Sequence, residues 1–101
     1  MFDIDGAIDE LNLYCDLEWR LDCAIDRLNY VINNLQYAEN GISRTLKIDS
    51  NRIDNNEISD IKNKLIGYRE YLSTTCKDAT INSKNNIVNT IENNGYEIIW
   101  G

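Results

Sequence analysis

The sequence comprises 101 residues, a length that corresponds to one domain. It contains no proline and no histidine. The absence of proline favours long, uninterrupted helices. Without histidine, Ser-His and Cys-His catalytic pairs and histidine-containing zinc sites are excluded, and the net charge of −7 disfavours direct binding to nucleic acid or to an anionic membrane surface. We therefore expect an all-α, non-enzymatic protein with no cofactor and no metal site.

The first predicted element is a helix over residues 6–40. Asp3 and Asp5 can accept hydrogen bonds from the free N–H groups of its first turn, and Gly41 is a residue type that commonly ends a helix. An extension past Gly41 also fits the periodicity. Apart from one step of six between Cys15 and Leu21, the apolar residues recur at steps of three and four, which places one stripe on one face: Ile8, Leu11, Cys15, Leu21, Ile25, Leu28, Ile32, Leu35 and Ala38.

A polar bend over residues 41–54 and a second helix over residues 55–94 follow. Ser, Thr, Asn and Lys become frequent in the second half of this helix, and this composition allows a kink or break near residues 78–83. Asn93-Asn94-Gly95 is a stop signal, after which residues 95–101 form an apolar tail. The apolar face of the second helix contains Ile58, Ile61, Leu65, Tyr68, Leu72, Cys76 and Ala79.

Two helices of similar length joined by a short connection fold back as an antiparallel hairpin, so residues 1–101 form a single helical-hairpin domain. With the bend near residue 47, Leu28 is expected to face Ile66. A hairpin buries only one stripe per helix, which predicts a homo- or hetero-oligomer. The residues expected to be buried are Leu11, Leu21, Ile25, Leu28, Ile32 and Leu35 against Ile58, Ile61, Leu65, Leu72, Ile87 and Ile91.

The acidic residues are concentrated on the first helix. Residues 1–40 contain nine acids but only Arg20 and Arg27 as basic residues. Glu18, Asp22 and Asp26 follow one another at steps of four and therefore share a helix face. This acidic face is either a solvated surface or a docking surface for a basic protein partner.

Three aromatic residues, Trp19, Tyr30 and Tyr37, fall on one line of the first helix, away from the predicted core. One interpretation is that these rings cover the flank of the hairpin or pack against the apolar tail, which contains Trp100. The other is that they meet a partner, since Trp and Tyr are common interface anchors. The candidate partner-binding residues are therefore Trp19, Tyr30, Tyr37, Glu18, Asp22, Asp26 and Trp100.

The start of the chain has neither the basic region nor the apolar run of a signal peptide, and no apolar segment approaches the length of a membrane span. We therefore expect no membrane insertion, and a cytoplasmic protein or one exported without a cleaved signal peptide. The three cysteines are expected to be reduced.

Two long helices joined by a polar bend resemble the small helical-hairpin proteins of type VII secretion, namely the WXG family and the partner proteins of LXG toxins. The most similar stretches are Leu65-Ile-Gly-Tyr-Arg-Glu-Tyr-Leu72 and Ile87-Val-Asn-Thr-Ile91, which look like the second helix of those partners. Two features differ. The bend lacks the Trp-X-Gly motif, and no Tyr or Phe is followed four residues later by Asp near the C-terminus, which is the export signal of that system.

The resemblance implies a targeting partner or chaperone that pairs with the helical domain of a secreted LXG toxin, with a second small helical protein, or with both. The alternative is an acidic phage-type inhibitor that imitates nucleic acid and blocks a host defence nuclease. A mimic should expose its acids and bind with a steep salt dependence, whereas a helical partner should bind through apolar surface.

Overall fold

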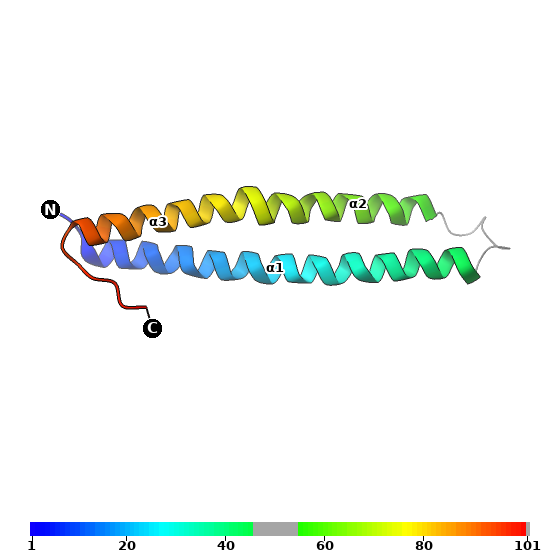
Figure 1. Cartoon of the computed structure of the whole chain (residues 1–101), viewed down its shortest axis with the longest axis horizontal. Coiled ribbons are helices and arrows are strands. Elements are labelled where there is room, and N and C mark those ends of the chain that lie inside the picture. Colours follow the sequence, from blue (N-terminus) through cyan, green and yellow to red (C-terminus); the bar gives the residue numbers. More distant parts are fainter. Residues whose placement is uncertain (46–54, 101) are drawn as a thin grey trace.

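The computed structural model is an antiparallel helical hairpin with two long arms (Figure 1). The all-α hairpin predicted from the sequence is confirmed. The first arm is a single helix, and three consecutive helical segments form what we call the second arm. The elements are α1 (Ile4–Thr45), α2 (Asn55–Tyr71), the π-helical segment η1 (Leu72–Cys76) and α3 (Lys77–Asn93).

The structure describes the backbone of residues 1–45 and 55–100, and the side chains of residues 1–41 and 56–100. The predicted bend over residues 41–54 therefore lies mostly outside the described residues. Its first part, as far as Thr45, is helix.

Asp3 caps the start of α1 as predicted. Its Oδ1 accepts a hydrogen bond from the Gly6 N–H at 3.1 Å, and its carbonyl oxygen accepts one from the Ala7 N–H at 3.1 Å. A Cβ atom at Gly6 would lie 2.6 Å from Asp3 Oδ2, so glycine leaves room for this cap. The helix begins at Ile4 rather than at residue 6, and Asp5 lies within its first turn, where a negative charge is favourable.

Gly41 does not end α1, because the helix continues to Thr45. This corrects the predicted end at residue 40. A glycine inside a helix costs only about 1 kcal/mol. This cost at Gly41 is not enough to end a helix when the residues on both sides of it are helical.

The stop signal at the end of α3 is confirmed and takes the form of a Schellman motif. Gly95 has a φ of +88°, in the left-handed region that favours glycine. Its N–H donates to the carbonyl oxygen of Glu92 at 3.0 Å, and the Tyr96 N–H donates to that of Ile91 at 3.4 Å. This turn directs the tail back along the first turns of α1 (Figure 1).

The hydrophobic core is thin and lies mainly at the end of the hairpin where the termini meet. Four apolar side chains are buried among the described residues: Ala7, Leu11, Ile32 and Ile91. All but Ile32 form one cluster, and the partly buried residues packed against it are Phe2, Ile4, Cys15, Ile87, Val88 and Ile98.

Most of the predicted core is only half-buried, including Leu21, Ile25, Leu28 and Leu35. Ile61 is the exception. Its side chain is 52% exposed, so its predicted burial is wrong.

The register between the arms is shifted by about one helical turn from the predicted one. Arg69 Nη1 donates a hydrogen bond to Asn29 Oδ1 at 2.9 Å, so Leu28 lies opposite the Arg69 region rather than opposite Ile66. The shift has a simple cause. Since α1 extends to Thr45, the midpoint of the connection is later in the chain than the predicted bend.

The second arm is irregular at residues 72–76 and not at residues 78–83, where a kink or break was considered. Residues 78–83 lie within regular α3. In η1 the Lys77 N–H donates to the carbonyl oxygen of Leu72, five residues earlier, which is the hydrogen bond that defines a π-helix.

Side-chain hydroxyl groups accompany this change of hydrogen bonding at both ends of η1. Thr74 Oγ1 donates to the carbonyl oxygen of Glu70 at 2.7 Å, and Thr80 Oγ1 donates to that of Cys76 at 2.8 Å. Ser and Thr side chains compete with backbone donors for carbonyl oxygens. The Ser- and Thr-rich sequence therefore does indicate a helix irregularity, but the irregularity lies at residues 72–76, before the predicted range 78–83.

The hairpin is a long, narrow body, 72 × 22 × 15 Å in extent. Its accessible surface is 7703 Å², whereas a compact monomer of this mass exposes about 5,900 Å². Among the described residues, each arm therefore packs against the other arm along its length and leaves its remaining faces open. None of the described helices contains a stretch long and apolar enough to cross a membrane.

Candidate protein interface

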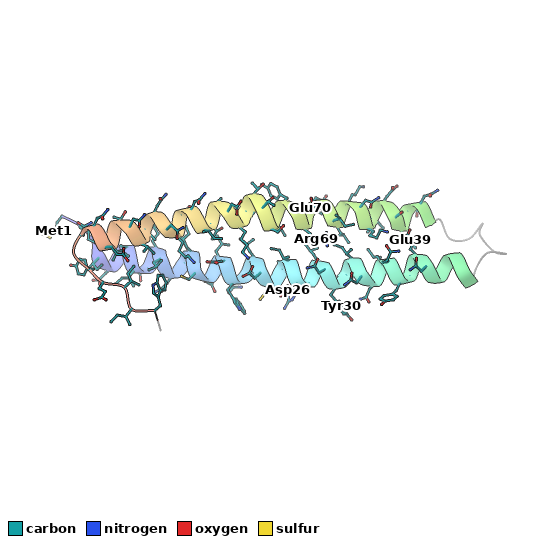
Figure 2. The ribbon with its side chains drawn as sticks, in the orientation of Figure 1. Met1, Asp26, Tyr30, Glu39, Arg69 and Glu70 are labelled. Carbon is teal, nitrogen blue, oxygen red and sulfur yellow. The ribbon has the colours of Figure 1, made fainter. Side chains whose placement is uncertain are left out.

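Basic residues of the second arm form a row of contacts with polar and acidic residues of α1. Lys62 Nζ lies 2.7 Å from Glu39 Oε2, Lys77 Nζ lies 2.6 Å from Asp22 Oδ1, and Lys84 Nζ lies 2.6 Å from Glu18 Oε2. The Arg69 contact with Asn29 lies within the same row. Figure 2 shows Arg69 and Glu39 between the two arms.

The spacing of these basic residues explains the position of η1. Lys62 and Arg69 are seven residues apart, as are Lys77 and Lys84, but Arg69 and Lys77 are separated by eight. A seven-residue step returns to nearly the same helix face, whereas an extra residue rotates the face away by about 100°. A π-helical turn accommodates one extra residue, and η1 lies within the eight-residue step, so both halves of the second arm present basic residues to α1.

The ion pairs stabilise the charged form of two of these lysines. A hydrogen bond to Asp22, assisted by its negative charge, raises the pKa of Lys77 above its ordinary value. A hydrogen bond to Glu18 likewise raises the pKa of Lys84.

The structure divides the three residues of the predicted acidic face. Glu18 and Asp22 are engaged with lysines of the second arm. Asp26 is exposed and lies on the side of α1 that faces away from α2 (Figure 2). The acidic residues of α1 thus serve partly as cross-links within the hairpin, and they do not form one continuous free surface.

The three aromatic residues of the predicted row are all exposed. The exposed fractions are 63% for Trp19, 70% for Tyr30 and 77% for Tyr37. Figure 2 shows Tyr30 on the same outer side of α1 as Asp26. We call this side, away from the second arm, the outer face of α1.

The apolar tail does not cover this row. It packs beside the first turns of α1, where the rings of Phe2 and Tyr96 have centroids 6.2 Å apart. A hollow of about 470 Å³ lies between the tail and α1, and none of the three aromatic residues lines it. Trp100, the remaining candidate, lines this hollow and stays largely exposed.

A second, shallow hollow of about 610 Å³ lies on α1 itself and is formed by one helix alone. We call it the outer-face hollow. Its apolar part combines an aromatic ring with small and branched side chains, and its polar part consists of two arginines. The lining residues are Trp19, Cys23, Ala24, Leu28 and Val31, with Arg20 and Arg27.

Sequence reasoning identified Trp19 but missed the rest of this hollow. The available signal was that Cys23, Ala24 and Val31 lie outside the core stripe, so the middle of α1 is apolar on more than one face. A helix that is apolar on several faces is normally covered on several faces. The sequence did not indicate that Arg20 and Arg27 line a hollow, because basic residues outside a core stripe are usually solvated.

The described residues contain no group of three or more His, Cys, Asp or Glu side chains placed to hold a metal ion. No family model, curated protein or solved structure matches this chain.

Proposed function

We propose that this protein is a non-enzymatic interaction module that pairs with the helical domain of a type VII secretion toxin of the LXG class, as a targeting partner or chaperone. The observation that carries the proposal is the exposed row of Trp19, Tyr30 and Tyr37 on α1, of which Figure 2 shows Tyr30 on the outer face. Large aromatic side chains are frequent energetic anchors of protein interfaces.

The extended shape supports the same proposal. The accessible surface exceeds that of a compact protein of equal mass by about 1,800 Å², an excess similar to the total area buried in a standard protein interface. A second helical protein lying along the hairpin would cover surface of this kind.

The charge arrangement favours a helical partner over a nuclease. A nucleic-acid mimic needs freely exposed carboxylates, but Glu18, Asp22 and Glu39 form ion pairs with lysines of the hairpin. The lysines partly balance the charge of these carboxylates, which weakens their attraction for a basic groove.

The test is affinity capture with the tagged chain from its native cell, followed by identification of the bound protein and by reconstitution of the complex from purified components. We expect a toxin with a helical domain, with binding weakened at least tenfold by Trp19→Ala and only slightly reduced by salt. Tyr71→Ala, an aromatic truncation at a similarly exposed position of α2, is the matched control. Recovery of a nucleic-acid enzyme with steeply salt-dependent binding would instead support the mimic.

A further inference from the structure

The outer-face hollow combines apolar surface with the two basic residues of the first 41 positions, Arg20 and Arg27, although this part of the chain is strongly acidic. We propose that it binds an apolar helix of a partner protein that places a carboxylate against Arg27. This inference rests on the proposed function and specifies the chemistry of the partner.

The two arginines differ in availability. Arg20 Nε lies 2.8 Å from Asp16 Oδ2, one turn away on the same helix, so its charge is already partly balanced. Arg27 is exposed, and no hydrogen bond or ion pair joins it to another of the described residues. Its guanidinium group therefore has five N–H donors available for an acceptor from outside.

Asp26 does not satisfy Arg27, because adjacent residues on a helix project in different directions. The acids next nearest along the helix, Glu18 and Asp22, are held by lysines of the second arm. An incoming carboxylate would thus meet an unpaired arginine beside a mostly apolar lining, and the partner helix would exclude water from the contact, which strengthens a charge-assisted hydrogen bond.

The apolar part of the hollow defines the rest of the ligand. Trp19, Cys23, Ala24 and Val31 extend over about three turns of α1. A partner helix lying along them would present apolar side chains at steps of three and four, with its acidic residue at the edge. A basic docking partner, as considered for the acidic face, would be repelled at this position.

The test uses two synthetic helical peptides of about five turns that share one leucine stripe and differ only in their flanking residues, Glu in one and Lys in the other. Binding to the full chain is measured by fluorescence anisotropy of the labelled peptides, with circular dichroism as a check that each variant is folded. We expect the Glu peptide to bind and the Lys peptide to bind at least tenfold more weakly.

Charge reversal then identifies the arginine. Arg27→Glu should weaken the Glu peptide by at least tenfold and improve the Lys peptide, while Trp19→Ala should weaken both. Lys64→Glu, which makes the same change of net charge at an exposed position of α2 outside the hollow, should leave the preference unchanged.

Three results would overturn the proposal: no binding of the Glu peptide, equal binding of both peptides, or an equal effect of Arg27→Glu and Lys64→Glu. A fourth is sedimentation of the free chain as a dimer that Trp19→Ala dissociates, because the occupant would then be a second copy. The peptides contain no toxin sequence, so failure here is distinguishable from failure of the capture experiment.

Discussion

Ile91 and Ile61 have the same side chain and lie on the same arm, but the structure gives them different energetic roles. Ile91 is 2% exposed and belongs to the cluster with Ala7 and Leu11. Ile61 lies near the other end of the hairpin and is half exposed. We expect Ile91→Ala to lower the free energy of unfolding by about 2–5 kcal/mol.

The matched substitution Ile61→Ala should cost less than about 1 kcal/mol, since it removes little buried surface. Urea unfolding followed by circular dichroism measures both values. Equal costs at the two positions would show that Ile61 is covered in solution, by self-association or by another arrangement of the arms.

The ion pairs of Lys77 and Lys84 predict a loss of stability at alkaline pH. The pKa of each lysine is raised in the folded chain by its carboxylate partner, above the ordinary value of 10.5. A raised pKa means that the folded state holds the proton more tightly. The contribution is therefore complete below pH 10.5 and is lost as the pH rises through the raised values.

The Lys84 contribution is isolated by comparing the natural chain with the double variant Lys84→Met, Glu18→Gln. The difference in unfolding free energy should be less than about 1 kcal/mol near neutral pH and should shrink only as the pH rises above the ordinary lysine pKa of 10.5. Lys64→Met, at an exposed lysine outside the row, is the matched control. A difference that grows with pH would contradict the assignment.

At the scale of the helices, the sequence placed three of the four ends of the two arms to within two residues. The Asp3 cap and the Gly95 stop depend on hydrogen bonds within a few residues, and such local signals are readable in one sequence. The end of α1 was predicted too early, at residue 40, because Gly41 indicates a helix end whereas the apolar periodicity continues past it. The early end also placed the bend too early, which caused the error in the register between the arms.

The face of α2 could not be derived from hydropathy. Lys62 has a side chain only 14% exposed, because it pairs with Glu39 across the interface, whereas the neighbouring Ile61 faces outward. Long basic side chains can bury their methylene groups while the charged end finds a partner. The outer-face hollow was missed for a related reason, since whether a basic side chain finds a carboxylate on the other arm depends on how the two arms pack.

The π-helical segment predicts that deleting one residue is tolerated within η1 but destabilising within α3. Removing Thr75, an exposed residue of η1, should convert the segment to α-helix and bring all four basic residues into steps of seven. Both halves of the second arm would keep their faces toward α1. We expect the free energy of unfolding to change by less than about 1 kcal/mol.

Removing Asn85 from regular α3 is the control. This deletion would rotate Ile87 and Ile91 by about 100° away from α1, so we expect it to cost more than about 2 kcal/mol. Thermal unfolding followed by circular dichroism distinguishes the two deletions. If both are equally damaging, η1 does not act as a register adjustment.

For the whole molecule, the large accessible surface predicts shallow denaturant transitions. The dependence of the unfolding free energy on urea increases with the surface that unfolding exposes, and ranges from about 1 to 3 kcal/mol per molar for small proteins. Because this hairpin already exposes 7703 Å², we expect a value near the lower limit. Bound partner should raise the midpoint, since it stabilises only the folded state.

Equilibrium urea unfolding at several protein concentrations measures this slope. A steep transition whose midpoint rises with concentration would mean that the free chain buries its open faces by self-association. A shallow transition that is independent of concentration is the expected result for the isolated hairpin.

The meeting of the two ends at Phe2 and Tyr96 also determines how the hairpin would respond to mechanical force. Tension applied between these ends would open the arms like a zipper, with the load carried first by the cluster around Leu11 and Ile91. The ion pairs of Lys84, Lys77 and Lys62 would then separate one after another. Pulling between one end and the far end of α1 would instead load the helix along its axis, so the direction of force decides whether the arms separate.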